Sequence, residues 1–542
     1  MTGSEGNTGG RGSSGGRSGA GKGAQGAGGP AGGGRGNGNT RDASRRNAKG
    51  RERNRGPQRS FTEQAPSQRT RRADPARLVA FEVLRAVAAE DAYANLVLPA
   101  RIRHHHLDKR DAGFATELSY GALRSQGTYD AVLARCVDRP LAQLDPAILD
   151  ALRIGAHQLL AMRVPAHAAL DQTVGLARAV IGAGPSTLIN AVLRKVAARS
   201  LEEWLDLLVE GETDATKVAA VRYAHPEWIV RAMRQSLVAH GRSAAEIDQL
   251  LEADNEAPVV NLVALPGLGS LDEALENGAT PGDLVEGSAL SSGGDLGRLA
   301  SVRAGTTRVQ DVGSQLVARA LAAVDLGTPG GGSGAGSASM AEDPEAWLDL
   351  CAGPGGKAAL LGALAHQRGA TLLANEPAPH RAKLVSQALS AIPHGSWQVR
   401  TGDGRDVGGE QPERYDRVLV DVPCTGLGAL RRRPESRWRR SPKDIADLGP
   451  LQRELLASAL AAVRPGGVVA YVTCSPHPAE TTAVVADVVR KRTDLELLDA
   501  GAALDAVSLT GSLGAGHELT AQLWPHIHHT DAMFLALIKK KA

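Results

Sequence analysis

The spacing of apolar side chains predicts helices in the first part of the chain that is able to form a core. Between residues 73 and 200 apolar residues recur at helical intervals, as in Leu78, Phe81 and Leu84, which places them on one face of a helix. Prolines fall between these stretches, where connecting loops are expected. We therefore predict an all-α domain over residues 73–200.

From Ala346 the pattern changes to short apolar strands that alternate with glycine turns and helices. The predicted strands are Trp347–Leu350, Thr371–Ala374, Trp397–Arg400, Val418–Val420, Val468–Val472 and Phe534–Ile538. This alternation is typical of an α/β domain in which helices cover both faces of a mostly parallel sheet. We predict such a domain over residues 311–542, opening with a helix at Ser314–Ala323.

The segment between these two domains, residues 201–310, has a mixed pattern. It contains one clear strand candidate, Val259–Leu265, followed by the irregular, Gly-rich stretch Gly267–Gly297. We predict a small α+β linker domain here. Residues 327–339 consist mainly of Gly, Ser and Ala, a composition that predicts a flexible insertion within the α/β domain.

Residues 1–72 have almost no apolar side chains and carry about fifteen Lys and Arg among many Gly, Ser and Asn. Such a segment cannot bury enough apolar surface to offset the entropy of ordering, so we predict a disordered basic tail. The whole chain has a net charge of only +3, and the remainder is therefore acidic. The tail is suited to contact RNA phosphates, although a purely solubilising role also fits.

No apolar run approaches the roughly 20 residues needed to cross a bilayer, and no apolar stretch typical of a secretory signal follows the N-terminus. The four cysteines lack the spacing of a zinc site or a disulfide framework. The histidines within residues 104–106 and 526–529 have no Cys or carboxylate partner at ligand spacing. We expect a cytoplasmic monomer without membrane or metal, and we assign Cys136 to helix packing.

The first candidate for chemistry is the glycine turn at residues 348–357, which ends a predicted strand and opens a helix. Missing side chains let the backbone approach a ligand at the strand ends, where doubly wound sheets bind nucleosides. A phosphate-binding P-loop is excluded because Ala358 follows Lys357 where Ser or Thr would be needed. Glu376 and Asp403 follow the next two strands and are placed to bind a ribose diol and an adenine amino group. The alternative is a tight turn without ligand, with each acid serving as a helix cap or a turn residue.

Two cysteines follow predicted strands directly. Cys424 comes shortly after Asp421, and Cys474 follows the predicted strand Val468–Val472 with only Thr473 between them. A buried cysteine is usually a packing residue, but two at neighbouring strand exits beside an acid indicate a reactive site at the edge of the sheet that would bind the nucleoside.

These residues lie within stretches that resemble a known family. The matching stretches are CAGPGGK (351–357), DVPCTGLGALRRRPESRWRR (421–440), YVTCSPHPAE (471–480) and TDAMFLALIKK (530–540), with LRIGAHQLL (152–160), Pro165–His167 and LINAVLRKV (188–196) in the helical part. From about Asp74 onward the chain resembles the Nop/Sun family of RNA cytosine-5 methyltransferases. It is most similar to the bacterial ribosomal RNA branch, RsmB or Sun, in which a NusB-like helical domain precedes a Rossmann-like methyltransferase domain.

The resemblance implies S-adenosylmethionine as methyl donor and RNA, specifically 16S ribosomal RNA, as partner. It assigns the nucleophile to Cys474, the resolving cysteine to Cys424, and a position near the methyl donor and the target base to Asp421. The implied donor-binding residues are Cys351, Ala352, Gly353, Pro354, Gly355, Gly356, Lys357, Glu376, Asp403 and Asp421. Two positions depart from the family pattern, since many members have Asp at 376 and Ala at 353.

Basic residues predict where RNA would bind. Those after Cys424 are Arg431, Arg432, Arg433, Arg437, Arg439 and Arg440, with Trp438 as a stacking face. Those of a possible basic face on the helical domain are Arg124, Arg153, Arg163, Arg178, Arg194 and Lys195. In both places a merely solvated surface is the alternative.

Other functions stay open at this point. The chain could be a non-catalytic NusB-like RNA-binding or antitermination factor, or a methyltransferase of another RNA. A DNA cytosine methyltransferase would use the cysteine of Pro423-Cys424 instead of Cys474.

Overall fold

The computed structural model describes residues 73–90, 92–327 and 344–542. The predicted basic tail lies outside the described residues, as does all of the Gly/Ser insertion except Gly327. Within the described part, no helix is both long enough and apolar enough to span a bilayer.

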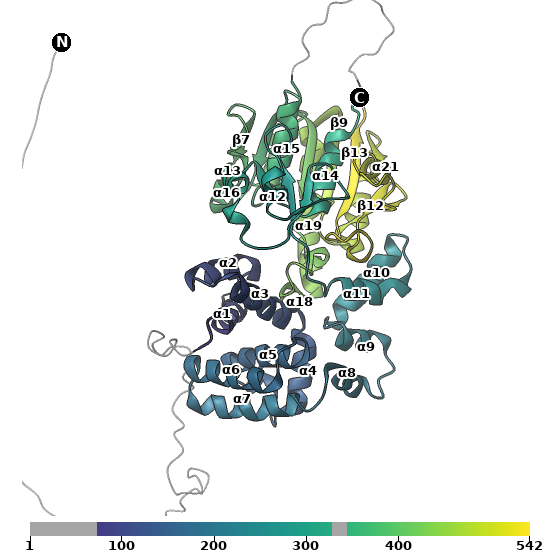
Figure 1. Ribbon diagram of the computed structural model, residues 1–542. Helices are drawn as coiled ribbons and strands as arrows, with labels where there is room; N and C mark the ends of the chain where they lie inside the picture. Colours follow the sequence, from purple (N-terminus) through teal and green to yellow (C-terminus); the bar gives the residue numbers. More distant parts are fainter. Residues whose placement is uncertain (1–72, 91, 328–343) are drawn as a thin grey trace, which may run out of the picture. The chain divides into compact units, whose positions relative to one another are not determined.

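The first part of the described chain is helical (Figure 1). Its helices are α1 (Pro75–Ala89), α2 (Ala94–His104), α3 (Lys109–Arg124), α4 (Gln126–Cys136), α5 (Pro146–Leu160), α6 (Ala166–Val180) and α7 (Ala183–Val196), with a 3-10 turn η4 (Leu141–Gln143). Asp74, Asp108 and Asp145 begin α1, α3 and α5 by accepting backbone N–H groups. The apolar faces meet in one core, which contains the buried Cys136, as predicted.

The segment that follows is first helical and then forms a small sheet. The elements are α8 (Leu201–Val209), α9 (Ala215–Arg222), α10 (Glu227–Ala239), η5 (Ala244–Glu246), α11 (Ile247–Ala253), β1 (Asn261–Ala264), α12 (Asp272–Glu276), β2 (Thr280–Pro281), β3 (Ser288–Leu290), η6 (Leu296–Arg298), α13 (Ala300–Ala304) and β4 (Thr307–Val309). The sheet is antiparallel, in the order β2-β3-β1-β4. The strand predicted at Val259–Leu265 is present as β1.

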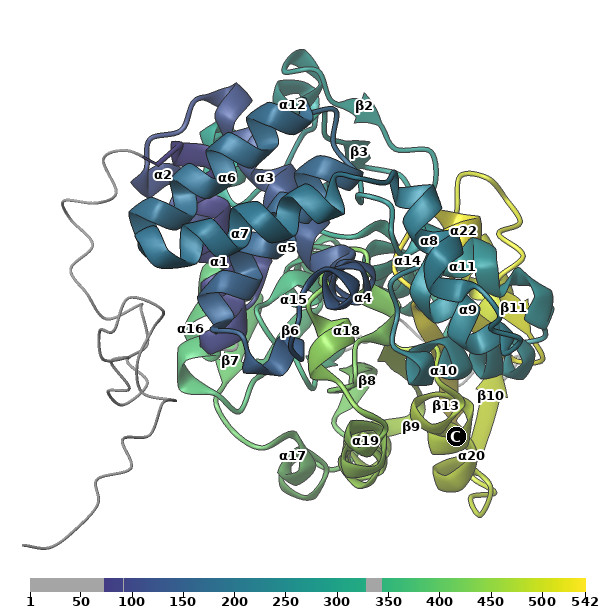
Figure 2. The ribbon, with the colours of Figure 1, turned by 90° about the horizontal axis from the view of Figure 1, so that it is seen from below.

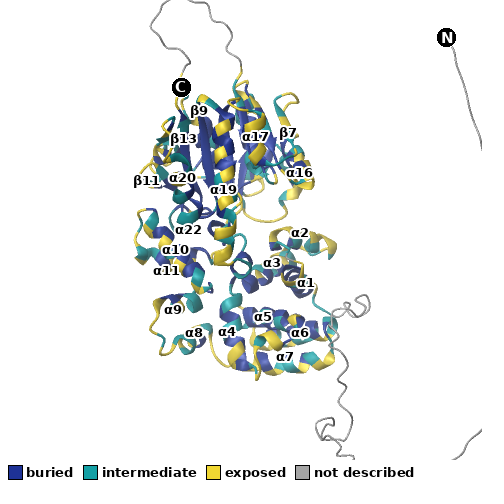
Figure 3. Ribbon diagram, turned by 180° about the vertical axis from the view of Figure 1, so that it is seen from behind, coloured by how far each residue is buried: buried dark blue, intermediate teal, exposed yellow. Residues whose placement is uncertain are grey.

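The rest of the described chain forms a mixed sheet between helices. The elements are α14 (Val312–Ala323), β5 (Ala346–Asp349), α15 (Gly356–Gln367), β6 (Thr371–Asn375), α16 (Pro379–Leu389), β7 (Trp397–Arg400), α17 (Gly404–Glu410), β8 (Tyr415–Asp421), η7 (Leu427–Ala429), α18 (Ser436–Arg439), α19 (Pro442–Ala462), β9 (Val463–Thr473), η8 (Pro478–Glu480), α20 (Thr482–Val489), β10 (Leu495–Leu498), α21 (Ala500–Asp505), β11 (Gly516–His517), β12 (Thr520–Gln522), α22 (Pro525–His528) and β13 (Phe534–Lys540). Figure 1 shows α14 and α15 on one face of the sheet, and Figure 3 shows α17, α19 and α20 on the other.

The strand order is β11-β12-β13-β9-β8-β5-β6-β7, and β10 pairs with β13. The strands from β9 to β7 are parallel, whereas β13, β12, β11 and β10 add in antiparallel fashion. All six predicted strands are present, and the predicted fold class, a Rossmann-like α/β domain after an all-α domain, is confirmed.

The central strands are apolar throughout because both faces are covered. Val418 and Val420 of β8 pack against the core that contains α19 and α20, while Leu419 between them packs against the core that contains α14 and α15. This alternation follows from the two-residue period of a strand. It fixes the register, since a slip by one residue would exchange the two faces.

Part of the basic segment after Cys424 is buried against protein and is not available to RNA. Arg437 is fully buried. Its guanidinium donates hydrogen bonds to the backbone carbonyls of Arg124, Ala224 and Asp254 and to Oδ1 of Asn255. Phosphate contact by Arg437 is therefore a wrong prediction, because the side chain is inaccessible to solvent and protein oxygens already accept from Nη1 and Nη2.

Neighbouring side chains are held in the same way. The indole of Trp438 donates to the carbonyl of Leu123 and lies so close to Gly127 of α4 that a Cβ there would be 2.3 Å from the ring; α18 and α4 lie side by side in Figure 2. Arg439 donates to the carbonyl of Val87 at 2.7 Å. Trp438 is thus a packing residue and not the predicted free stacking face.

The other predicted RNA contacts divide into paired and exposed residues. Arg431 is buried, Arg432 pairs with Asp531, Arg433 lies over the Tyr93 ring, and Arg440 pairs with Asp444. On the helical domain, Arg124 is buried and Arg153 is held by Asp130 and Asp150, so these two do not form a basic face. Arg163, Arg178, Arg194 and Lys195 are at least partly exposed and stay a prediction.

The Arg437 contacts generate a testable pH dependence through Asp254. Burial raises the pKa of Asp254 to about 7, and the charge of Arg437 only partly opposes this shift; the ring of His225 also faces the carboxyl, at 3.8 Å. A pKa raised by folding stabilises the native state at low pH, and this contribution is lost as the pH rises through 7. The melting temperature of Asp254→Asn, relative to that of the wild type, should therefore rise from pH 5 to pH 8, because only the wild type loses this contribution. A difference in melting temperature that stays constant over this range would contradict the assignment.

Candidate active site

The parallel strands bring the predicted residues to one edge of the sheet. β5 pairs with both β6 and β8, and β8 pairs with β9 with Asp421 opposite Val472. Carboxyl ends of parallel strands share an edge, so the glycine turn after β5, Asp421 at the end of β8 and Cys474 after β9 are neighbours.

The glycine turn is shaped as the sequence predicts. Gly353 and Gly355 have φ values of 56° and 89°, a region that favours glycine. A Cβ on Gly355 would lie 2.6 Å from the Cβ of Ala388, whereas the space around Gly356 is open. Helix α15 begins at Gly356, and its first N–H groups have no acceptor within the helix. They are available to an anionic group such as a carboxylate.

Four carboxylates act on the thiol of Cys351. Burial raises the pKa of this thiol well above its usual value, and the charges of Asp349, Asp421, Glu376 and Asp403 raise it further. Cys351 is therefore a neutral thiol and not a nucleophile. The predicted acids do gather around the glycine turn, and this concentration of negative charge suits a cationic ligand.

Asp349 is the member of this group that sequence reasoning missed. It ends β5, is 1% exposed, and its Oδ2 has no hydrogen-bond partner. Burial, together with the charge of Asp421, raises its pKa to about 7. Asp349 ends a strand, as Asp421 does. This position at a strand end was the sequence signal that could have identified it as a site residue.

The other two acids have local partners. Glu376 accepts the N–H of Ala378 and pairs with Arg381 at 2.7 Å. Asp403 caps α17 and pairs with Arg405. Asp403 thus acts as a helix cap and Glu376 as a turn residue, which fits the alternative to ligand binding; ligand binding by either acid stays a prediction.

Lys357 and Asp421 form an ion pair at the centre of the site, with Nζ 2.8 Å from Oδ2. Burial alone would lower the pKa of Lys357, but Asp421 and other negative groups raise it above its usual value. The lysine is therefore a fixed positive charge next to the acid that was predicted to face the base.

The two cysteine sulfurs are in contact, with Sγ of Cys424 3.4 Å from Sγ of Cys474. The hydrogen bond between them raises the pKa of Cys424 and lowers that of Cys474. Lys357 lowers the pKa of Cys474 as well, while burial and Asp421 oppose this. Of the two thiols, Cys474 is thus the one that loses its proton more readily, and a thiolate is the nucleophilic form of cysteine.

A glycine allows the loop with Cys424 to approach the strand end with Cys474. The N–H of Gly428 donates to the carbonyl of Cys474 at 2.8 Å. A Cβ at this position would lie 2.2 Å from the carbonyl oxygen of Ala532 and 2.8 Å from that of Cys474. Only glycine fits between these two backbones.

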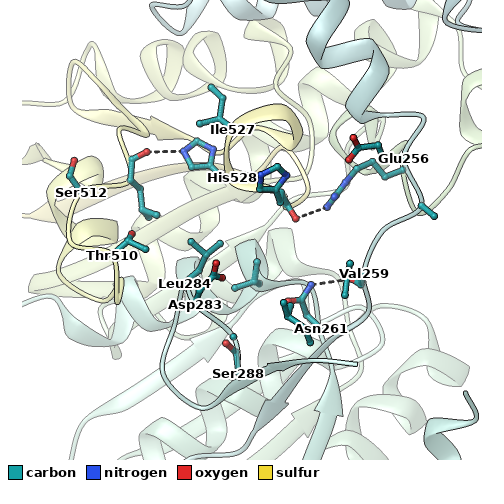
Figure 4. A pocket seen from close by; sticks show the side chains of 17 residues that line it. Glu256, Val259, Asn261, Asp283, Leu284, Ser288, Thr510, Ser512, Ile527 and His528 are labelled. Atoms are coloured by element: carbon teal, nitrogen blue, oxygen red, sulfur yellow. Dashed lines mark hydrogen bonds between the residues drawn. The ribbon is translucent and has the colours of Figure 1, made fainter. Parts of the chain in front are cut away.

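A separate cavity of about 510 Å³ lies between the small sheet and the C-terminal segment (Figure 4). Its lining includes Asn261, Asp283, Ser288, Arg431 and His528 and none of the predicted donor or catalytic residues. Among the described residues, no group of three or more His, Cys, Asp or Glu is placed to hold a metal ion.

The parallel strand ends, glycine turn and surrounding acids define a Rossmann-like methyltransferase domain. A family model described as 16S rRNA methyltransferase RsmB/F matches residues 339–539, and the NusB family model matches residues 74–198. With these matches and the relatives below, the chain belongs to the RsmB/F methyltransferase family.

The relatives align over nearly their whole length. Rv1407 of Mycobacterium tuberculosis, named as a methyltransferase, is 46% identical over 484 residues, which is 89% of this chain and 100% of that protein. Ribosomal RNA small subunit methyltransferase B of Erwinia tasmaniensis is 30% identical over 78% of this chain and 92% of its own length. The crystal structure of PH0851 has the same fold, with a TM-score of 0.70 at 20% identity over 86% of this chain and 99% of that one.

The unequal thiols can be tested by alkylation. With iodoacetamide and peptide mapping across pH 6–10, Cys474 should react at lower pH than Cys424, because only the thiolate reacts. Lys357→Met removes a positive charge and should slow the alkylation of Cys474 several-fold at pH 7. The exposed Lys491→Met serves as control. Earlier reaction of Cys424, or no effect of Lys357→Met, would contradict the described electrostatics.

Proposed function

We propose that the protein is an S-adenosylmethionine-dependent RNA (cytosine-5)-methyltransferase that acts on 16S ribosomal RNA. The observation that carries the proposal is the contact between two thiols of opposite pKa shift next to the Lys357–Asp421 pair. A cytosine carbon-5 is too weak a nucleophile to accept a methyl group unaided. One thiolate to activate the ring and one thiol to assist its release meet that requirement.

The residues at the glycine turn fit the methyl donor. The free N–H groups at the start of α15 suit its methionine carboxylate, the acids around Cys351 suit its positive charges, and Glu376 and Asp403 would bind the ribose and the adenine. When bound, S-adenosylmethionine supplies an electrophilic methyl group. The roles of Cys351–Lys357, Glu376 and Asp403 in holding it are part of the proposal.

The chain's own residues would then act in sequence. The Cys474 thiolate forms a bond to carbon-6, and the ring electron pair moves to carbon-5, which takes the methyl group. As the adduct forms, nitrogen-3 takes up a proton from water and donates a hydrogen bond to the Asp421 carboxylate, and this proton returns to water when the ring is released. After the carbon-5 proton passes to water, the bond between sulfur and carbon-6 breaks, and the S–H of Cys424 stabilises the departing thiolate by the hydrogen bond seen between the two sulfurs.

The relatives support ribosomal RNA as substrate, since one is named for the small subunit RNA and the NusB match covers the helical domain. A DNA-type reaction through Cys424 is disfavoured by the raised pKa of that thiol. A non-catalytic factor would not need the assembled thiol pair. We further propose that the enzyme acts as a cytoplasmic monomer and needs no metal.

Two cysteine variants test this assignment. With unmodified 16S ribosomal RNA transcript and radiolabelled S-adenosylmethionine, Cys474→Ala should lose at least about a thousandfold in methyl transfer, because it removes the nucleophile. Cys424→Ala should retain the first transfer but accumulate an enzyme–RNA adduct that survives denaturation. Cys136→Ala, in the helical core, is the control. Full activity of Cys474→Ala would refute the function as proposed.

A further inference from the structure

Glu480 is a buried carboxylate without a cation. Its side chain is inaccessible to solvent, and among the described residues no Lys, Arg or His forms an ion pair with it. It is instead satisfied by neutral donors. Oε1 accepts the N–H of Thr425 at 2.9 Å and the amide of Gln452 at 3.1 Å, and Oε2 accepts the hydroxyl of Thr425. A buried carboxylate costs free energy unless it is so bonded, and these donors keep it in one place.

The donors flank Cys424. Thr425 follows it directly, and the amide of Gln452 also donates to the carbonyl of Pro423, which precedes it, at 2.9 Å. We call Glu480 and Gln452 the clamp, since together they hold the peptide groups on both sides of this cysteine. The β8–β9 pairing cannot do so, because its last bond runs from Val422 to Val472.

The clamp is also tied to the segment that follows Cys474. The hydroxyl of Thr425 lies 3.4 Å from that of Ser475, and the hydroxyl of Tyr471 in β9 donates to the backbone carbonyl of Glu480. Glu480 thus joins the loop of one cysteine to the strand and loop of the other.

We propose that Glu480 is a positioning residue that, with Gln452, holds Cys424 in contact with Cys474 so that the enzyme can release its methylated product. The proposal rests on the function given above and concerns its last step. Without the clamp, the S–H of Cys424 loses its fixed place beside the sulfur that must leave. Attack and methyl transfer, which need Cys474, Asp421 and Lys357, proceed.

The charge of Glu480 supports the same role. It raises the pKa of Cys424 and so keeps this thiol protonated as a donor. Other titratable or charged groups near Cys424 and Glu480 include Tyr471, His477, Cys474, Asp421 and Arg453.

Two substitutions separate position from charge. Glu480→Ala removes every clamp contact. Glu480→Gln keeps the acceptor for Thr425 N–H and Gln452, and its amide donates to the Thr425 hydroxyl, which then turns its proton to Ser475. The amide variant therefore preserves the geometry without the charge.

The test follows adduct and turnover on unmodified 16S ribosomal RNA transcript with radiolabelled S-adenosylmethionine. Glu480→Ala should transfer the first methyl group at a rate within about threefold of wild type, release product at least tenfold more slowly, and accumulate the denaturation-resistant adduct as Cys424→Ala does. Glu480→Gln should recover most of the release rate. Glu496→Ala, an exposed acid on β10, is the matched control and should resemble wild type.

Several results would overturn the proposal. Wild-type release by folded Glu480→Ala, or loss of the first transfer without adduct, would show that Glu480 does not position Cys424 for release. If Glu480→Ala does not fold, Gln452→Met decides, with a smaller accumulation of adduct expected and wild-type release as the contrary result. Failure of the proposed function appears separately, as full activity of Cys474→Ala or absence of adduct in Cys424→Ala.

Discussion

The proposed function depends on the contact between two sulfurs, which for that function must differ in protonation. At 3.4 Å two thiolates would repel each other, and two neutral thiols would lack a nucleophile. In the proposed function the two sulfurs share one proton, and both the hydrogen bond from Cys424 and the positive charge of Lys357 lower the pKa of Cys474. The proposed function therefore requires that the segments carrying Cys424 and Cys474 be held in a fixed relative position. Several features of the surrounding structure hold them there.

Strand alignment, a close backbone contact and side-chain hydrogen bonds all contribute to this fixed position. Successive residues of β8 and β9 alternate between two apolar cores, which fixes the alignment of the strands, and Gly428 lets the loop of Cys424 approach the carbonyl of Cys474. The same loop continues into α18, where Arg437 bonds to carbonyls of the helical segments. The helical part of the chain is thus joined to the catalytic loop through side chains that a basic sequence would assign to RNA.

Much of this could be predicted from sequence, and the failures have physical reasons. The six predicted strands, and the position of both cysteines after strands, could be read from the sequence because apolar runs are local signals. β10 and β11 were not predicted, since β11 has only two residues and Glu496 interrupts the apolar run of β10. Arg437 was misassigned because charge does not reveal whether a guanidinium meets phosphates or buried carbonyls. The sequence places Asp349 at a strand end but does not reveal its burial, and the partners of Glu480, Thr425 and Gln452, come close to it only in the folded chain.

The central claim is that Cys474, and not Cys424, bonds to the pyrimidine. The most direct measurement is to incubate the enzyme and S-adenosylmethionine with a 16S transcript containing 5-fluorocytidine, in which fluorine blocks the loss needed for release, and to map the crosslinked peptide by mass spectrometry. The account predicts a methylated adduct on the peptide that carries Cys474. An adduct on the peptide that carries Cys424, or no adduct at all, would contradict it.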